Sequence, residues 1–349
     1  MSDLVRVGVV GLGWFGRTHL DAWSACRGAE VVGVCDRDPL ALDPVRARAQ
    51  ERFHRDAGAE RTSLPSDLPR FGSLEQLLEA GIDLLDVVVS EDEHEPCVRA
   101  GLASGVDVLV EKPLALTLDA AEDLVGLARR FDRRLFVGQV LRFDARHIAL
   151  WEAAQGRDLR HLSLARAFQV SAHDVYGRTH PVLNAAVHDI DLAIWLTGRA
   201  PERVSAFASH FLGREHPDCL DLVLEWDGGL RAVVQNGWHL TPSCPYGFTF
   251  DCVVQASDAT FTLRNEPVLQ AWTETVQYPE IFLWPRYAGI RAGALVAELQ
   301  HVADCVHRGE ASERMPLAQV LNVMATCQAA IDALEAGTSQ APRRVVASG

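Results

Sequence analysis

The chain has 349 residues, of which 48% are hydrophobic and 23% charged, a composition that favours two folded domains and argues against long disordered segments. Its net charge of −14 argues against binding to nucleic acid or to an anionic membrane surface, because both require a basic footprint. No apolar run approaches the ~18 residues of a transmembrane helix, and the N-terminus has no signal-peptide pattern. We therefore expect a cytoplasmic protein.

The first part of the chain alternates short apolar runs with helical stretches. The predicted strands are Val5–Val10, Val31–Cys35, Leu84–Val89, Val106–Val110 and Leu135–Val140, and the predicted helices are Thr18–Ala25, Leu74–Ala80, Pro96–Ser104 and Ala120–Arg130. Short strands of valine and leucine between helices are typical of a parallel sheet that is buried on both faces. We predict an α/β domain with a buried parallel sheet over residues 1–142.

A G-x-G-x-x-G pattern joins the first predicted strand to the first helix. It consists of Gly11, Leu12, Gly13, Trp14, Phe15 and Gly16. In this context the glycines allow a tight turn and a close backbone approach, and the helix N-terminus faces a pyrophosphate. A glycine turn without a ligand is the alternative.

Asp36 ends the second predicted strand, 20 residues after Gly16. A carboxylate there accepts hydrogen bonds from the adenosine ribose hydroxyls and repels a 2′-phosphate, which favours NAD over NADP. Arg37 follows directly and is expected to soften that preference. A solvated acid at the end of a strand is the alternative for Asp36.

Lys112 is the only lysine, since 32 of the 33 basic residues are arginine. A site that needs a compact amine able to lose its proton cannot use arginine. Lys112 lies in Glu111-Lys112-Pro113, directly after a predicted strand, where ligands bind in parallel sheets. We expect Lys112 beside a nicotinamide ring, with a cis Lys112–Pro113 bond permitted by the proline.

Three acids and a histidine follow the strand Leu84–Val89, namely Glu91, Asp92, Glu93 and His94. A metal site is one interpretation, but no second cluster has ligand spacing. We favour a solvated loop, or a negative charge run at the N-terminus of the helix near Pro96, and we predict no metal.

From Phe143 onward the segments are longer and alternate apolar with polar residues. The predicted strands are Leu162–Val170, Arg203–Phe211, Cys219–Trp226, Leu230–Gln235, Phe248–Gln255 and Thr260–Leu263, and Asp227-Gly228 is a hairpin signal. Two amphipathic helices follow, the second ending at Gly337. We predict a second domain over residues 143–349, with a large, mostly antiparallel sheet that has one face free.

A predicted helix, Leu183–Leu196, carries Asn184, His188 and Asp191. The i, i+4 spacing puts Asn184 and His188 on one face, and Asp191 is within reach of His188 at i+3. A histidine oriented by an acid is a candidate general base. A capped, partly buried histidine is the alternative.

The eight cysteines include no C-x-x-C pair, and several lie in apolar segments. This distribution indicates reduced, buried thiols and no disulfide framework or zinc site.

Taken in order, the glycine pattern, Glu-Lys-Pro, the Gly-x-x-x-Arg-Phe of residues 138–143 and the His-x-x-Asp helix resemble the Gfo/Idh/MocA oxidoreductases over essentially the whole chain. The resemblance implies a Rossmann domain followed by an α/β domain whose open sheet supports substrate binding on one side and subunit contact on the other. It also implies NAD(P)-linked transfer of a hydride to or from a secondary alcohol or ketone of a sugar, sugar derivative or cyclic polyol such as an inositol, in a homodimer or homotetramer.

Carried over by position, Lys112 matches the catalytic lysine of the family and His188 its catalytic histidine. Asn184 stands where the family usually has aspartate, so its role there is to orient a hydroxyl and not to relay a proton. Val89-Ser90-Glu91 departs from the usual Thr-Pro-Asn, and Thr179-His180-Pro181 replaces a glycine-rich stretch. These loops border the expected pocket, so the substrate is not inherited from the family.

The resemblance and the motifs together define the expected site. Catalytic residues are Lys112, His188 and Asn184. Cofactor contacts are Gly11, Leu12, Gly13, Trp14, Phe15, Gly16, Asp36, Arg37, Ser90, Glu91, His94, Glu111, Lys112 and Gln139. Candidate substrate residues are Arg142, His173, Tyr176, Arg178, His180 and Trp238. Two other functions stay open: NAD-assisted glycoside cleavage on the same fold, and a non-catalytic regulator that senses the dinucleotide.

Overall fold

The computed structural model describes residues 4–42, 64–172, 177–241, 243–244, 247–264, 271–272, 276–277 and 281–345. The predicted substrate residues His173 and Tyr176 lie outside the described residues. The chain divides into two compact units. The first contains the described parts of Met1–Arg52, Gly58–Asp144 and Glu280–Leu317, and the second those of Ala145–Pro279 and Ala318–Gly349.

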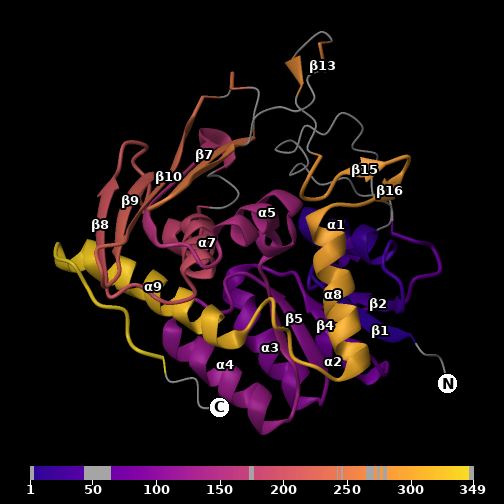
Figure 1. The fold of residues 1–349 in the computed structure, drawn as a ribbon. Coiled ribbons are helices and arrows are strands. Elements are labelled where there is room, and N and C mark those ends of the chain that lie inside the picture. The colour runs from indigo at the N-terminus through magenta and orange to yellow at the C-terminus, as the bar shows by residue number, and fades with distance from the viewer. Residues whose placement is uncertain are drawn as a thin grey trace. The chain divides into compact units, whose positions relative to one another are not determined.

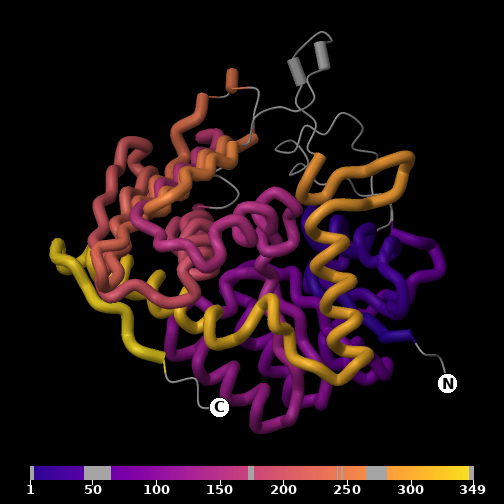
Figure 2. Tube along the Cα trace, viewed as in Figure 1, coloured from indigo at the N-terminus to yellow at the C-terminus, as the bar shows by residue number. Residues whose placement is uncertain are grey.

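This division differs from the sequence expectation, which assigned everything after residue 142 to the second domain. The segment Glu280–Leu317 returns to the first unit and carries α8 (Ala294–Arg308). In Figure 2 the orange tube of α8 runs beside the indigo elements of the N-terminus. Polar contacts attach it: the Gln300 amide accepts a hydrogen bond from Arg27 N–H and donates one to Arg27 O. Such non-local contacts leave no pattern in the sequence.

The first unit is built on a six-stranded parallel sheet with the order β3-β2-β1-β4-β5-β6. Its strands are β1 (Val5–Val10), β2 (Ala29–Cys35), β3 (Arg70–Phe71), β4 (Leu84–Val87), β5 (Asp107–Glu111) and β6 (Leu135–Gly138). This is the Rossmann order, with the switch point between β1 and β4, and it confirms the predicted fold class. The two-residue β3 was missed because it is too short to show a pattern.

Helices connect the parallel strands of this sheet (Figure 1). They are α1 (Trp14–Trp23), α2 (Leu74–Glu79), α3 (His94–Ala103) and α4 (Leu118–Arg130). Short 3₁₀ turns at Glu91–Glu93 and Val140–Phe143 follow the carboxyl ends of β4 and β6. The loops that follow β1, β4, β5 and β6 therefore leave the sheet at one edge, which is where ligands bind in such folds.

A small hairpin, β15 (Arg286–Tyr287) with β16 (Ile290–Arg291), precedes α8 in the same unit. Arg286 and Arg291 both form ion pairs with Asp21 of α1, at 2.7 and 2.6 Å. Two arginines on one half-buried carboxylate attach this segment firmly to the first helix of the chain.

The second unit is built on a six-stranded sheet with the order β12-β11-β7-β10-β9-β8. The strands are β7 (Leu159–Gln169), β8 (Arg203–Ser209), β9 (Cys219–Glu225), β10 (Arg231–Leu240), β11 (Phe248–Ala256) and β12 (Thr260–Arg264). All neighbouring pairs are antiparallel except β7 with β10, which confirms the mostly antiparallel sheet. Gly228 and Gly229 adopt positive φ angles in the predicted β9–β10 hairpin.

One face of this sheet is covered by α5 (Ala145–Ala154) and α7 (Val187–Thr197), as Figure 1 shows. Burial alternates along the strands, with Leu220, Leu222 and Leu224 of β9 buried and Asp221 exposed. A second, two-stranded sheet pairs β13 (Ala271–Trp272) with β14 (Val276–Gln277). The alternation follows the pleat of a sheet that has one covered face.

The last helix, α9 (Leu317–Ala336), ends before Gly337, whose φ is +66°. Within the described residues it is the one helix long and apolar enough to cross a membrane by length and composition, with a mean hydropathy of 1.3. This corrects the expectation that no apolar run approaches that length. Since 56% of that stretch is buried inside the protein, α9 is a core helix.

Candidate functional site

The glycine turn after β1 has the geometry of a dinucleotide cradle. Gly11 has a φ of +94°, and a Cβ there would lie 2.3 Å from Val88 O. A Cβ on Gly16 would lie 1.9 Å from Gly11 O, whereas one on Gly13 would meet nothing within 4 Å. No side chain caps α1 at Gly13, so its first turn is an uncapped helix N-terminus of the kind that binds phosphate. These residues fit the pyrophosphate of a dinucleotide.

Asp36 lies half-buried directly after β2 and is bonded to the glycine turn. Its Oδ2 accepts a hydrogen bond from Leu12 N–H at 2.6 Å, and its Oδ1 accepts one from Asp38 N–H at 2.8 Å. Each carboxylate oxygen retains a further lone pair, so the group is positioned to accept ribose hydroxyls as well. Leu12 therefore contributes its backbone N–H to holding Asp36, while its side chain is buried.

Arg37 is exposed and forms an ion pair with Glu93, with Nη1 and Oε1 2.9 Å apart. Glu93 belongs to the acidic segment after β4, which the sequence interpretation regarded as a solvated loop or a helix-start charge run. Here that segment forms a 3₁₀ turn, Glu91–Glu93, directly before α3. Ser90 is half-buried before the turn and Glu91 is buried within it.

Lys112 follows β5 and is half-buried, and its bond to Pro113 is cis, as the sequence allowed. The carboxylate of Glu111 accepts a hydrogen bond from Lys112 N–H at 3.3 Å. His94 supports the next residue, because its Nδ1 lies 2.7 Å from Pro113 O and its Nε2 lies 3.3 Å from Val89 O. Burial lowers the pKa of His94, so its ring is neutral. This geometry gives His94 a role in holding the loop, beside the predicted cofactor contact.

Trp14 and Phe15, the variable residues of the glycine pattern, form an aromatic cluster with Trp284. The ring centroids of Trp14 and Phe15 lie 6.1 and 5.4 Å from that of Trp284. Phe15 also meets the ring of His19 at 4.7 Å. The sequence analysis missed Trp284, since no motif marks a residue 270 positions away from the turn that it covers.

Asn184 and His188 do not lie in one regular helix, as the sequence analysis expected for Leu183–Leu196. A π-helix spans Val182–Ala186, and α7 starts at Val187. The wider turn changes the angular spacing, so the simple i, i+4 argument for a shared face does not hold there. Asn184 is buried, and its Nδ2 donates to Thr179 O at 3.0 Å.

His188 has a distinctive exposure. Every other residue from 181 to 196 is buried, whereas His188 is half-buried and reaches the surface of the second unit. Asp191, the expected orienting acid, is itself buried. An accessible imidazole in an otherwise closed helix is what a general base for a bound ligand requires.

The other predicted substrate and cofactor residues have different environments. Arg142 is fully buried and donates from Nη1 to Arg314 O. Trp238 is 2% exposed and stacks on Phe168, with centroids 4.7 Å apart. Gln139 is also buried, whereas Arg178 is exposed. Arg142 and Trp238, which the sequence analysis gave as candidate substrate residues, therefore lie in a core environment.

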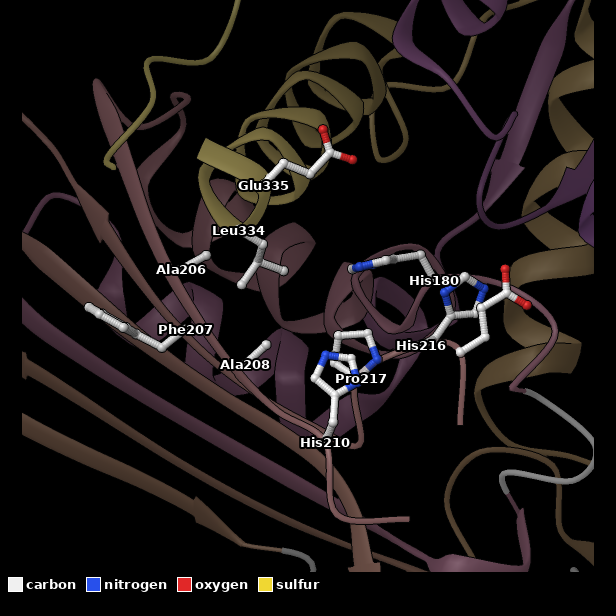
Figure 3. Close-up of a pocket in the computed structure, with 10 residues that line it drawn as sticks. His180, Ala206, Phe207, Ala208, His210, His216, Pro217, Leu334 and Glu335 are labelled. Carbon is white, nitrogen blue, oxygen red and sulfur yellow. The ribbon is translucent and has the colours of Figure 1, made fainter. Parts of the chain in front are cut away.

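His180 lines a pocket of about 440 Å³ in the second unit, which Figure 3 shows in close-up. The pocket also holds His210, His216 and, from α9, Glu335. His180 Nδ1 accepts a hydrogen bond from Val182 N–H, and burial, with the neighbouring His216 and His210, lowers its pKa to about 4. Its neutral ring therefore carries a proton on Nε2. Neither catalytic candidate of this unit, Asn184 or His188, is among the lining residues.

Among the residues that the structure describes, no group of three histidine, cysteine or acidic side chains is arranged to hold a metal ion. All eight cysteines lie within the described residues as free thiols. Five are buried, whereas Cys26, Cys219 and Cys244 are half-buried.

Two models of known protein families match this chain. Residues 5–139 match the model described as "Oxidoreductase family, NAD-binding Rossmann fold", and residues 163–262 match the "GFO/IDH/MocA C-terminal domain". The chain belongs to the Gfo/Idh/MocA oxidoreductase family. It is accordingly an NAD-binding dehydrogenase, and the predicted family, enzyme class and cofactor are confirmed.

Two named enzymes are similar to this Gfo/Idh/MocA chain over 95% and 65% of its length. It is 27% identical to inositol 2-dehydrogenase 2 of Paenarthrobacter aurescens over 95% of this chain and 96% of that enzyme. It is 28% identical to D-apiose dehydrogenase of Paraburkholderia graminis over 65% of this chain, which spans only 58% of that relative. The solved structure of GenD2 from gentamicin A biosynthesis in complex with NAD has a TM-score of 0.81 at 20% identity, covering 99% of this chain and 98% of that one.

The Gfo/Idh/MocA site also contains buried polar residues that the sequence analysis missed. His19, Asp86 and Glu298 are each at most 1% exposed in the first unit. One signal was present: Asp86 is a charged residue inside the apolar strand β4. Glu298 gave none, because it lies on a helix that returns from a distant part of the chain.

Proposed function

We propose that this oxidoreductase transfers a hydride between NAD and the secondary alcohol or ketone of a sugar, sugar derivative or cyclic polyol. The observation that carries the proposal is the half-buried His188 in a stretch of otherwise buried residues, because a proton acceptor must reach its substrate. The relatives named for inositol and D-apiose support a polyhydroxylated substrate. Their low identity leaves the particular compound to experiment.

The cofactor would be held by the glycine turn and Asp36. The uncapped first turn of α1 would bind the pyrophosphate, and Asp36 would accept the ribose hydroxyls. NAD is favoured over NADP because Asp36 is anionic beside the site of a 2′-phosphate. Arg37 does not offset this preference, since its guanidinium is paired with Glu93. When bound, NAD accepts the hydride from the carbinol carbon.

In the oxidation direction His188 takes the proton of the hydroxyl that becomes the carbonyl. Lys112 donates a hydrogen bond to the same oxygen and stabilises its developing negative charge. Asn184 orients a neighbouring hydroxyl, because an amide donates and accepts hydrogen bonds but does not relay a proton. Residues with exposed polar groups near these segments, such as Arg178, are the candidates for substrate selectivity.

The test is a screen of the purified protein against polyols, aldoses and sugar nucleotides, with NAD and NADP in separate reactions. Absorbance of NADH at rising substrate concentration identifies a substrate. A compound that is consumed with stoichiometric NADH formation supports the proposal. Cleavage of a glycoside without net NADH would instead indicate NAD-assisted glycoside cleavage, and turnover of no polyhydroxylated compound in either direction would contradict the proposed class.

We also propose that the enzyme is a homodimer or homotetramer that pairs through the uncovered face of the β7–β12 sheet. The helices α5 and α7 cover only the other face. The uncovered face carries Phe207, which is 64% exposed on the edge strand β8. An exposed aromatic side chain on an open sheet supports burial against a second copy. The free thiols support a reducing, cytoplasmic location.

A further inference from the structure

Four ionisable side chains are gathered beneath the loop that carries Lys112. His19 lies on α1, Asp86 in β4, Glu111 at the end of β5 and Glu298 on α8. We call these four residues the buried charge cluster. His19 and Glu298 are each 1% exposed, Asp86 is fully buried, and the Glu111 side chain is 13% exposed.

His19 connects two carboxylates of this cluster. Its Nδ1 lies 2.9 Å from Asp86 Oδ2, a hydrogen-bond distance. Its Nε2 lies 3.5 Å from Glu111 Oε1, which is longer than a direct hydrogen bond and corresponds to an ion pair. With a carboxylate on each side, the ring is stabilised with both nitrogens protonated. Burial alone would lower the pKa of His19, but Asp86 and then Glu111 raise it to about 10.

Glu111 is confined on its other sides by the backbone. Its Oε2 accepts the hydrogen bond from Lys112 N–H, so the carboxylate is tied to the first atom of the lysine. A Cβ on Gly138 of β6 would lie only 2.6 Å from Glu111 Oε1, so the carboxylate rests directly on that glycine. The Glu111 carboxylate is thus held between His19, Gly138 and the backbone of Lys112.

We propose that His19 is a positioning residue that, through the Glu111 carboxylate, sets the place of Lys112. This rests on the catalytic role proposed for Lys112. The contact with Asp86 is not by itself a reason for a histidine at this position, because Trp23 Nε1–H already donates to Asp86 Oδ2 at 2.7 Å. The Nε2 atom of His19, by contrast, faces Glu111 Oε1, a contact that Trp23 does not make. Displacements near 1 Å at a reacting group cost up to ~100-fold in rate.

Two substitutions separate the two sides of the ring. In His19→Asn the amide nitrogen takes the place of Nδ1, which keeps the donor to Asp86 and removes the contact with Glu111. In His19→Gln the amide nitrogen takes the place of Nε2, which keeps a donor toward Glu111 and leaves Asp86 to Trp23. We expect kcat of His19→Asn to fall by about 10- to 100-fold. We expect kcat of His19→Gln to fall by at most about fivefold, the scale of one neutral hydrogen bond.

Trp23→Phe is the matched control, because it removes a buried donor to the same Asp86 oxygen without touching Glu111. This variant should have a lower melting temperature and a kcat within about threefold of wild type. A change of about threefold in kcat corresponds to less free energy than one hydrogen bond contributes. The dissociation constant for NADH, followed by fluorescence, should stay within that range in all three variants. Gly138→Ala is a second, independent probe, since its methyl group displaces the Glu111 carboxylate without removing a charge. It should lower kcat as His19→Asn does.

The variants give distinct outcomes. A full kcat in both His19→Asn and Gly138→Ala would overturn the proposal. A larger loss of kcat in His19→Gln than in His19→Asn would also overturn it. An equal loss of kcat in Trp23→Phe and His19→Asn would do the same, because each of these results indicates a purely structural role. Where His19→Asn fails to fold, Gly138→Ala decides alone. Lys112→Arg is assayed in parallel. If Lys112→Arg retains turnover, the proposed catalytic role of Lys112 is wrong. If Lys112→Arg is inactive while His19→Asn and Gly138→Ala are fully active, the role of Lys112 stands and only the role of His19 is wrong.

Discussion

Lys112 is the single lysine among the 33 lysine and arginine residues, so the other 32 are arginine. Guanidinium groups stay protonated and present a wide planar fork, whereas an ammonium is a compact point charge. At the residue scale this contrast makes Lys112 and the accessible His188 the two positions at which substitutions test the chemistry most directly.

We predict that Lys112→Arg and His188→Ala both lose turnover and keep the cofactor. Loss of a general base costs ~10²–10⁴-fold. The guanidinium of Lys112→Arg is larger than the ammonium and displaces the donor to the developing oxyanion, a donor whose removal costs ~10²–10³-fold. The glycine turn and Asp36 are untouched, so both variants should still bind NADH. The measurements are kcat on the substrate found by the screen and NADH fluorescence. Near wild-type turnover in either variant would remove that residue from the mechanism.

The second prediction concerns Asp36 and the choice of cofactor. The wild type should use NADH with a higher kcat/KM than NADPH. Asp36→Ser should lower the ratio of kcat/KM for NADH to kcat/KM for NADPH by about tenfold. The substitution removes a negative charge that repels the 2′-phosphate, and tenfold corresponds to ~1.4 kcal/mol. Adding Glu93→Gln should lower this ratio further, because it releases Arg37 for a 2′-phosphate. Steady-state kinetics with both cofactors decide this, and a wild-type preference for NADPH would contradict it.

The third prediction concerns Glu298 and the effect of pH on stability. Burial, and then the charge of Glu111, raise the pKa of Glu298 well above its usual value. The folded state keeps a proton that the unfolded state releases, so this group loses stabilising effect as the pH rises above the ordinary glutamate pKa. Glu298→Gln keeps a neutral acceptor for Gln139 N–H. We expect its melting temperature relative to wild type to rise between about pH 5 and pH 8.

The comparison uses the difference between the two melting temperatures at each pH, so that effects common to both proteins cancel. A difference that stays constant, or one that falls with rising pH, would show that Glu298 is ionised in the folded protein.

At the element scale, a buried ion pair joins the central strand of the second sheet to the helix that carries His188. Arg166 of β7 and Asp189 of α7 are 6% and 0% exposed, with Nη2 and Oδ1 2.9 Å apart. The Arg166 guanidinium also lies 4.5 Å from the centroid of the Phe250 ring. The neighbour of His188 along the chain is therefore fixed to the sheet, which holds the start of α7 in place.

We predict that Asp189→Ala destabilises the protein by ~3–5 kcal/mol, because it leaves the buried Arg166 without its partner. Glu225→Ala is the control. It breaks ion pairs with Arg203 and Arg231, whose side chains are both 62% exposed, and should cost at most ~1 kcal/mol. Urea unfolding measures both values. Equal costs for the two variants would mean that the Arg166–Asp189 pair contributes no more than a surface pair.

At the scale of the whole molecule, α5 and α7 cover one face of the β7–β12 sheet. We expect a second copy of the chain to cover the other face. We predict a mass in light scattering of two or four times the 38.3 kDa chain. Phe207→Asp should shift the population toward the monomer, because it replaces an exposed aromatic side chain of the proposed contact face with a charge that association would bury. A 38.3 kDa species for the wild type at every working concentration would contradict the proposed assembly.

Local sequence patterns predicted many of the strands, turns and helix ends of this protein. The glycine turn, the parallel strands of the first unit, the alternating strands of the second, the hairpin at Asp227-Gly228 and the helix end at Gly337 were all predicted, because each follows from the conformational preferences or the burial period of neighbouring residues. The rarity of Lys112, which made it a candidate, is likewise a property of composition, and its catalytic role stays a prediction.

Only the tertiary structure decided where distant segments meet. The return of Glu280–Leu317 to the first unit, the cover of Trp284 on the glycine turn and the burial of Glu298 near Glu111 depend on contacts between residues more than a hundred positions apart. The π-helix before α7 and the burial of Arg142 were decided in the same way, by packing around them. These contacts depend on the free energy of the whole folded core. A short stretch of sequence does not include the distant residues that contribute to that free energy, so it does not predict the contacts.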